Sequence, residues 1–290
     1  MSVLPICVCS SCPAHVGESV SWVGPCPAYL SSCTDEQWAL LERLLPPPGN
    51  TAGKGGRNEK HARRLVVDAI FYLVRGGIAW AALPTDFPPP KTVYDIFRRW
   101  TKQGVWQRVT DALRDRIRVR EGREAIPTAA VIDSQSIRGA DTVHRDTRGW
   151  DNGKKVGGRK RHIAVDTLGL LLCVVVTAAS TQDRDGAHRL LALVREKFST
   201  VTLTWADSGY TGRLVVWAKQ VLTITITIIK RTDPGFVVLP RRWVVERTFA
   251  WISKHRRCVR DYETLPAHHE AMVHIAMIMT MSRRLARSTA

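Results

Sequence analysis

The second half of the chain alternates short apolar runs with amphipathic segments, and this alternation is the feature that most constrains the fold. Runs with the length of buried strands occupy residues 128–134, 161–167, 170–178, 201–207 and 222–229. Between them, residues 185–198 have the apolar spacing of an amphipathic helix. Two of the runs flank Leu168 and Gly169 and are expected to pair as a hairpin. Strands interleaved with helices predict an α/β domain with a mixed sheet.

The residues before this region predict helices. Thr34 and Gln37 have the spacing of a capping box, and Pro46 ends the helix that they begin. A second helix is expected to stop at Gly77, and a third carries Arg98 and Arg99. Two helices joined by a turn, the second of them basic, indicate a helix-turn-helix-like DNA-binding region. The alternative is an ordinary packed pair with a solvated basic face.

The charge balance favours a polyanionic partner. The 290 residues contain 43 Lys plus Arg against 26 Asp plus Glu, a formal charge of +17, and nucleic acid is the first partner that such a charge suggests. No apolar run approaches the roughly 20 residues of a spanning helix, so we expect no membrane association. The cysteine-rich residues 1–33 lack paired zinc-finger spacing, and we expect an unstructured extension of a reduced, cytoplasmic protein.

Three acids are candidates for chemistry. Asp133 and Asp207 each end a predicted strand, and ligands gather at the carboxyl ends of strands in α/β sheets. Glu246 is an isolated acid in an apolar and basic helix. Three converging carboxylates repel one another unless a divalent ion such as Mg²⁺ binds them. Taken singly, each Asp is also explained as a turn cap, and Glu246 as a helix ion pair with Arg242 or Arg247.

Other acids are better explained by local structure. Asp166 lies before the Leu168–Gly169 turn, and we expect it to have a turn role rather than a metal role. Asp183 and Asp185 precede a helix, and N-capping accounts for them.

Residues 138–161 are polar and are expected to form a loop. Their positive charges surround several glycines, a composition that lets a backbone approach a phosphate chain closely. The alternative is a solvated, mobile loop. The residues of this segment that are predicted to contact DNA, together with His162 directly after it, are Lys154, Lys155, Arg159, Lys160, Arg161 and His162. Arg148 adds to the positive charge. The aromatic residues around Glu246 are expected to pack in the core rather than to stack on bases.

These segments resemble, in order, the transposases of the insertion-sequence-five family. The motifs are VIDSQS, GWDNGKK, GRKRHIAVDTLGLLLCVVVTAASTQDRDGA, WADSGY and RRWVVERTFAW, preceded by TDEQWALLERLLPPP and GGIAWAALPTDFPPPKTVYDIFRRW. The resemblance implies a ribonuclease H-like catalytic fold and a DDE triad at Asp133, Asp207 and Glu246. It also implies Mg²⁺ or Mn²⁺ as cofactor, double-stranded DNA with terminal inverted repeats as substrate, and a homo-oligomer that holds both ends.

The resemblance extends to Arg242, four residues before Glu246, which would orient that acid or a phosphate. It weakens on either side, because Leu239 stands where a Tyr is expected and Ser253 where a Lys is expected, with Lys254 one position later. One step rotates a helical side chain by about 100°. The chain is therefore expected either to cut and join DNA, by attack of water and then of the freed 3′-hydroxyl, or to be a catalytically impaired DNA-binding descendant.

The sequence also allows two other kinds of DNA-cleaving enzyme. One is a recombinase with a covalent link, for which Tyr262 beside Arg260 is the only hint, and the other is a nuclease without strand transfer. The predicted organisation is an extension at 1–33, a helical DNA-binding region at 34–122, and a catalytic domain with C-terminal helices at 127–290. A bacterial DNA substrate would place such a protein on the nucleoid in the cytoplasm.

Overall fold

The helical region begins with the expected capping box. The computed structural model describes residues 29–47, 59–229 and 243–287. Thr34 Oγ1 accepts a hydrogen bond from the Gln37 amide at 3.3 Å, and Gln37 Oε1 accepts one from the Thr34 amide at 3.2 Å. The helices are α1 (Asp35–Glu42), α2 (Arg63–Gly76), α3 (Pro90–Lys102) and α4 (Val105–Arg120), with the short 3-10 segment η1 (Trp80–Ala82) between α2 and α3.

The turn after α2 requires glycine. Gly77 caps the helix with φ of +72°, and a Cβ there would lie 2.8 Å from Cβ of Arg256. This close approach joins the end of α2 to the 3-10 segment η4 (Arg256–Cys258). The predicted stop at this glycine is confirmed, and its reason includes a tertiary contact that the sequence does not reveal.

The last residues of the predicted extension are packed. The Tyr29 ring contacts those of Tyr72 and Phe87 at centroid distances of 4.7 and 5.2 Å, and the Cys33 amide donates to Asp68 Oδ1 at 2.7 Å. Residues 29–33 therefore belong to the helical core, and the remainder of the predicted extension lies outside the described residues.

The second half forms a mixed six-stranded sheet. Strand β1 (Ala129–Arg138) pairs antiparallel with β3 (Val156–Val165) on one side and parallel with β5 (Leu203–Ala206) on the other. Strand β3 continues the antiparallel part through β2 (Gly149–Asp151) and β4 (Leu171–Ala178), while β5 pairs in parallel with β6 (Thr225–Ile228). An antiparallel meander followed by parallel strands beyond its first strand is the ribonuclease H-like arrangement. The expected hairpin around Leu168 and Gly169 is confirmed as β3 and β4.

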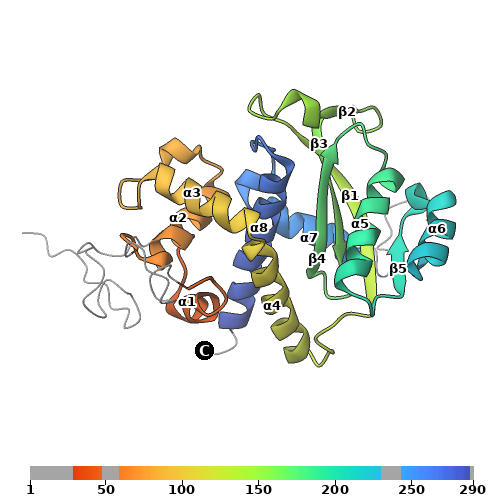
Figure 1. Ribbon diagram of the computed structural model, residues 1–290, viewed down its shortest axis with the longest axis horizontal. Helices are drawn as coiled ribbons and strands as arrows, with labels where there is room; N and C mark the ends of the chain where they lie inside the picture. The colour runs from red at the N-terminus through yellow and green to blue at the C-terminus, as the bar shows by residue number, and fades with distance from the viewer. Residues whose placement is uncertain (1–28, 48–58, 230–242, 288–290) are drawn as a thin grey trace, which may run out of the picture.

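Helices cover both faces of the sheet (Figure 1). Helices α5 (Asp183–Lys197) and α6 (Arg213–Leu222) cover one face, and α7 (Trp243–Ser253) and α8 (Pro266–Ala286) lie on the other. Alternation along β1 divides its side chains between these two cores, so that Ile132 packs with the first pair and Val131 with the second. Each face of the sheet is therefore buried, as the uninterrupted apolar runs predict.

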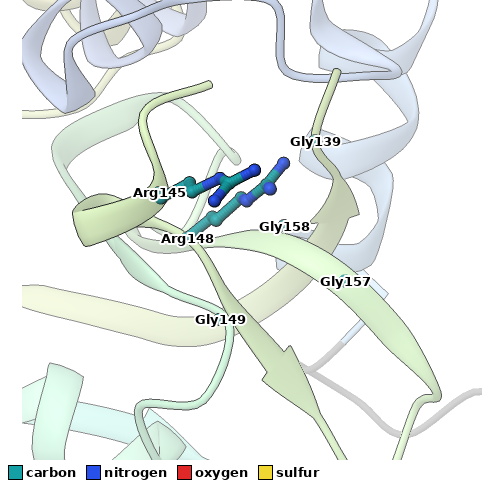
Figure 2. A pocket seen from close by; sticks show the side chains of 6 residues that line it. All are labelled: Gly139, Arg145, Arg148, Gly149, Gly157 and Gly158. Carbon is teal, nitrogen blue, oxygen red and sulfur yellow. The ribbon is translucent and has the colours of Figure 1, made fainter. Parts of the chain in front are cut away.

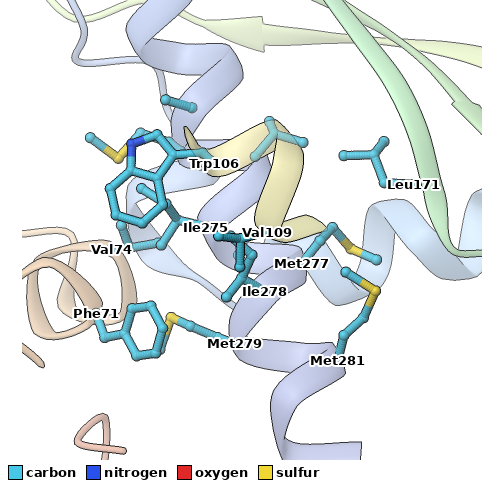
Figure 3. Packing of buried hydrophobic residues seen from close by; sticks show 14 of the residues in the cluster. Phe71, Val74, Trp106, Val109, Leu171, Ile275, Met277, Ile278, Met279 and Met281 are labelled. Atoms are coloured by element: carbon cyan, nitrogen blue, oxygen red, sulfur yellow. The ribbon is translucent and has the colours of Figure 1, made fainter. Parts of the chain in front are cut away.

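Helix α8 connects the sheet to the helical region. It packs against α1, α2, α4 and β4, and Figure 3 shows its Ile275 and Ile278 among side chains from α2 and α4, with Leu171 of β4 nearby. Every residue from Ala271 to Met279 is buried, so the middle of this helix is enclosed on all sides. The proposed division between residues 34–122 and 127–290 therefore crosses a shared core.

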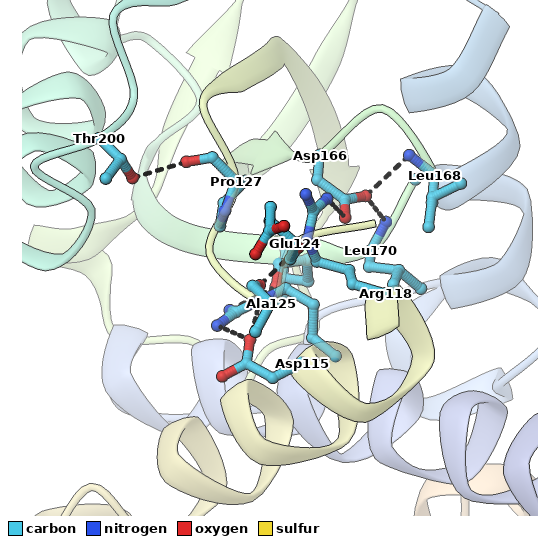
Figure 4. A network of polar contacts seen from close by, with 12 residues as sticks. Asp115, Arg118, Glu124, Ala125, Pro127, Asp166, Leu168, Leu170 and Thr200 are labelled. Atoms are coloured by element: carbon cyan, nitrogen blue, oxygen red, sulfur yellow. Dashed lines mark hydrogen bonds and ion pairs between the residues drawn. The ribbon is translucent and has the colours of Figure 1, made fainter. Parts of the chain in front are cut away.

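A buried ion pair fixes α4 to the β3–β4 turn (Figure 4). Arg118 Nη1 lies 2.5 Å from Asp166 Oδ2, and both side chains are buried. Asp166 Oδ1 accepts the amides of Leu168 and Leu170 at 2.9 and 2.8 Å. The turn role predicted for Asp166 is confirmed, and its carboxylate also anchors a helix.

The structure corrects the expectation that residues 138–161 form a loop. Strand β1 continues to Arg138, β2 and β3 form a second hairpin from residue 149 onward, and only the 3-10 segment η2 (Arg145–Thr147) and its flanks are irregular. The polar composition is misleading because the alternate side chains of a strand find buried ionic partners here. Among the described residues, no helix has the length and hydropathy required to cross a membrane.

We expect Ile275→Ala to lower the free energy of unfolding by about 2–5 kcal/mol, because it removes a fully buried side chain from the core shared by α2, α4 and α8. Denaturant unfolding followed by tryptophan fluorescence and by circular dichroism measures the change. The two signals should move together in one transition. Val216→Ala on the exposed side of α6 is the control, with a change within about 0.5 kcal/mol; two separate transitions would show that the helical region and the sheet fold independently.

Candidate active site

Asp133 and Asp207 both lie close to the parallel pairing of β1 with β5. Asp133 is in the middle of β1, not at its end as predicted, because the strand continues to Arg138, and Asp207 directly follows β5. Val131 pairs with Trp205 in the parallel ladder, and each acid follows its paired residue by two positions. Residues two apart point to the same face, and neighbouring strands lie about 4.8 Å apart. Both acids are half-buried. The parallel pairing therefore brings these two positions to the same part of the sheet, near the face that Val131 and Trp205 share with α7.

Each of these carboxylates also receives a local amide hydrogen bond. Asp133 Oδ1 accepts from the Ser134 amide at 2.7 Å. Asp207 Oδ1 accepts from Gly209 at 2.8 Å and caps the 3-10 segment η3 (Ser208–Tyr210). The turn-capping explanation is thus met at Asp207 by one oxygen.

Glu246 is exposed in the first turn of α7, which packs against β1 and β3. Thr248 Oγ1 donates to the Gly169 carbonyl at 2.7 Å, beside the amino end of β1. The Phe249 ring instead lies 5.6 Å from the Arg161 guanidinium, next to Gln135 beyond Asp133. At 100° per residue, Glu246 lies about 60° from Phe249 around the helix and about 160° from Thr248. Glu246 therefore projects from the edge of α7 nearer the carboxyl end of β1.

The described residues contain no group of three acidic, His or Cys side chains close enough to enclose a metal ion. The donor chemistry nevertheless suits a hard divalent cation, because the acids on β1, β5 and α7 offer only carboxylate oxygen. Two of them are fixed by the sheet. The third is carried by a helix whose preceding residues lie outside the described part of the chain.

A buried polar cluster that the sequence did not reveal lies beneath Asp133 and Asp207. Burial, and then the charges of Asp133, Asp183 and Asp207, raise the pKa of the Tyr210 phenol well above its usual value. Its neutral hydroxyl therefore lies within electrostatic reach of both Asp133 and Asp207. The only sequence signal was its position in ADSGY, where an apolar strand leads directly into a turn.

Asp183 forms the other side of this cluster. Lys160 Nζ lies 2.8 Å from Asp183 Oδ1 and 3.3 Å from Asp151 Oδ2. Burial raises the pKa of Asp183, but hydrogen bonds from Lys160 and Ser134 and the lysine charge outweigh it, so the pKa is lowered overall. Asp183 is the first residue of α5, but Gln182 occupies the N-cap and no side chain caps the helix, so the N-capping predicted for Asp183 and Asp185 is wrong. The Asp183 carboxylate is instead an ion-pair partner of Lys160.

Comparison with known proteins identifies the family. Residues 124–281 match the family model described as the transposase DDE domain, and residues 33–110 match the model of putative transposases of the IS4/5 family. The chain belongs to the DDE transposases. Members of this family generally use divalent metal ions.

Individual relatives agree with this membership. The transposase is 30% identical over 106 residues to an uncharacterised protein of insertion element IS402 from Burkholderia cepacia, an alignment that covers 36% of the chain and 71% of the relative. It is 30% identical over 125 residues to an uncharacterised protein of Sinorhizobium fredii, covering 43% of the chain and 86% of the relative. It is 28% identical over 139 residues to a putative transposase of IS402 from Burkholderia cepacia, covering 45% of the chain and 66% of the relative.

Four of the predicted DNA contacts of the transposase are buried inside it. Arg159, Lys160, Arg161 and His162 lie in β3, each no more than 5% exposed. Arg159 pairs with Asp261 at 2.9 Å and Arg161 donates to the Cys258 carbonyl at 2.8 Å. Burial lowers the pKa of His162 to about 4, so its ring is neutral. The expectation that these four side chains grip a phosphate backbone is wrong, because all four are buried inside the protein.

Other predicted contacts are exposed. Lys154 and Lys155 occupy the turn of the β2–β3 hairpin, and Arg98 and Arg99 lie on the outer side of α3. Arg99 also lines a cavity of about 340 Å³ between α2 and α3. These four side chains are accessible to DNA in the transposase, and their role stays a prediction.

The neighbours of Glu246 divide in the same way. Arg242 and Leu239 lie outside the described residues. Lys254 is exposed directly after α7, and its carbonyl accepts from Arg75 Nη1 at 2.6 Å. Phe249 packs in the core as expected, whereas Trp243 is 40% exposed and stacks on the Arg247 guanidinium. The stacked cation shields one face of that indole, which makes its exposure tolerable.

We expect Arg159→Met to destabilise the transposase by about 3–5 kcal/mol, because it leaves the buried Asp261 carboxylate without its cation. Lys155→Met removes an exposed charge and should change stability by less than about 0.5 kcal/mol. Urea denaturation of the two variants measures both values. Equal stability of the two proteins would return Arg159 to the list of candidate DNA contacts.

Proposed function

We propose that this transposase cleaves DNA at the ends of its insertion sequence and joins the freed ends to target DNA. The pairing of β1 with β5, which brings the positions of Asp133 and Asp207 to the same part of the sheet, is the observation that supports the proposal. Glu246 on α7 is the third member of the set. Double-stranded DNA with terminal inverted repeats is the proposed substrate, and a homo-oligomer on the nucleoid would hold the two ends.

The three carboxylates would hold Mg²⁺ or Mn²⁺. Such an ion activates the attacking oxygen and neutralises charge on the phosphate during transfer. The strand pair fixes two of the ligands before any ion binds, so that little ordering remains for the protein. Tyr210, neutral and buried beneath the pair, would keep these carboxylates oriented.

The chemistry consists of two balanced displacements at phosphorus. In the first, a water oxygen bonds to the scissile phosphorus, the bond to the 3′-oxygen breaks, and the proton lost by water is balanced by the one gained by that 3′-oxygen. In the second, the freed 3′-hydroxyl bonds to a target phosphorus and a target 3′-oxygen leaves. Neither step requires an oxidant, a reductant or a covalent protein intermediate.

A second candidate is a DNA-binding descendant that no longer cleaves. It is favoured by the end of α7, where Ser253 rather than a Lys shares the face of Glu246. Lys254 directly follows α7, and its amide still donates to the Ala250 carbonyl at 3.2 Å. Its side chain therefore lies about 80° around the axis from Glu246. A lysine in that direction is less well placed to position a phosphate held at Glu246.

We expect Asp133→Asn, Asp207→Asn and Glu246→Gln each to abolish strand cleavage in Mg²⁺ while preserving DNA binding, because each removes a charged ligand but not the fold. Cleavage is measured on supercoiled plasmid that carries the terminal repeats of the element. Asp141→Asn, an exposed acid after β1, is the matched control and should keep full activity. Full cleavage by Asp133→Asn would refute the assignment, and an inactive unmodified chain that still binds the repeats would favour the second candidate.

An independent readout locates the ion without requiring activity. Fe²⁺ with ascorbate and peroxide cuts a polypeptide next to bound iron, so fragments should end near residues 133, 207 and 246.

The variant Tyr262→Phe, assayed for DNA cleavage and for a protein–DNA adduct, tests the covalent alternative. The Tyr262 ring already contacts the Arg257 and Arg260 guanidiniums at 5.1 and 5.8 Å. We expect the variant to cleave normally, and a protein–DNA adduct that disappears with it would contradict the proposal.

A further inference from the structure

A cavity of about 550 Å³ opens beyond the carboxyl end of β1. Four glycines and two arginines line it: Gly139, Arg145, Arg148, Gly149, Gly157 and Gly158. They come from three segments that the β1–β3 and β2–β3 ladders bring together. Figure 2 shows the Arg145 and Arg148 side chains extended beside each other across this hollow, toward Gly139.

At two positions in the wall of the cavity, the surrounding structure leaves no room for a side chain. Gly158 has φ of +156°, and a Cβ there would lie 2.2 Å from the Ile137 carbonyl oxygen. A Cβ on Gly149 would lie 2.4 Å from Ser180 Oγ. The fold therefore excludes side chains from this wall. Bare backbone lets a ligand approach closely enough to contact both peptide groups and the two arginines.

The charge of the cavity is positive and uncompensated within the described part of the chain. No acid lines it, and neither arginine has a carboxylate within ion-pair distance among the described residues. The adjacent Asp146 is directed to His144 at 3.3 Å instead. A third guanidinium lies at the rim, where Arg260 Nη2 donates to the Gly139 carbonyl at 3.2 Å.

The two cavity arginines differ from the buried arginines, which have acidic partners. Arg159 and Arg257 are neutralised by Asp261 and Glu263 at 2.9 and 2.7 Å. The two cavity arginines are exposed, and their neighbouring like charges repel each other unless an anion lies between them. A guanidinium fork matches the paired oxygens of a phosphate.

We propose that this cavity binds a phosphodiester of the DNA backbone. The identity of the ligand as DNA rests on the proposed function, whereas its phosphate chemistry rests on the cavity alone. Gly139 follows Asp133 by six residues on or next to β1, which corresponds to about 20 Å at the rise of a strand. That distance is roughly half a turn of duplex. The cavity holds the DNA at a second point, so that the scissile phosphate is presented to Asp133 and Asp207 at a fixed register.

The test is the salt dependence of duplex binding by the full chain, in EDTA so that no cleavage occurs. The test variant is Arg145→Gln/Arg148→Gln, and the control is Arg116→Gln/Arg123→Gln, which removes the same charge from exposed positions on and after α4. Each lost phosphate contact should reduce the slope of log K against log salt by about 0.9. We expect the test variant to lose about 0.9–1.8 in slope and about ten- to hundredfold in affinity. The control should change little.

Two results would overturn the inference: unchanged binding by the test variant, or equal losses in both double variants. Thermal unfolding checks that both are folded. Arg145→Lys/Arg148→Lys keeps the charge without the fork, so it should retain the slope and lose part of the affinity. Inorganic phosphate is also compared with chloride at equal ionic strength for its effect on thermal unfolding. If phosphate stabilises the unmodified protein but not the test variant, and both bind the duplex with equal affinity, the cavity binds a free anion and the DNA proposal fails.

The outcome is separable from that of the proposed function. The same titrations in the Asp133→Asn chain measure binding whether or not this acid is catalytic. If the arginine double variant has a reduced salt slope and Asp133→Asn still cleaves DNA, the cavity is a DNA contact and the triad is refuted. If the double variant has an unchanged slope and Asp133→Asn no longer cleaves, the triad stands and the cavity proposal is refuted.

Discussion

Strand β1 is the constraint on which the rest of the structure depends. It is the only described strand that pairs antiparallel on one side and parallel on the other, so it fixes the direction of every other strand in the sheet. Its pairing with β5 brings the positions of Asp133 and Asp207 to the same part of the sheet. Its far end opens into the cavity of Arg145 and Arg148. Catalysis and DNA positioning would therefore share one element whose geometry the backbone hydrogen bonds determine.

The ionic interior supports this strand. The cations of β3 point alternately to the two faces of the sheet, and they find Asp261, Gln135 or Asp183 there. A buried charge is tolerated only when it is paired, and removal of one partner is costly. The pairs hold β1, β3 and the segment before α8 in one arrangement. They also explain why the side chains of Arg159 to His162 are buried although this segment is strongly basic.

Helix α8 joins this sheet to the helical region. Because its buried side chains contact α1, α2 and α4 as well as β4, the orientation of Arg98 and Arg99 relative to the acids is set by packing rather than by a linker. A DNA molecule that met α3, the hairpin turn at Lys154 and the arginine cavity would meet surfaces held in one fixed relation. This arrangement suits an enzyme that must place one phosphate accurately on a long substrate.

The sequence alone determined the fold class, the hairpin at Leu168 and the capping box at Thr34, because apolar periodicity and turn residues are local signals. It placed Asp133 at the end of a strand, whereas β1 continues to Arg138. It misjudged residues 138–161, since a polar strand with buried ion partners has the composition of a loop. Only the tertiary structure placed Tyr210 beneath the acids, removed Arg159 to His162 from the surface, and brought Arg145 and Arg148 together over glycine. Those arrangements depend on contacts between segments distant in the chain, and a single sequence carries no direct record of which distant residues meet.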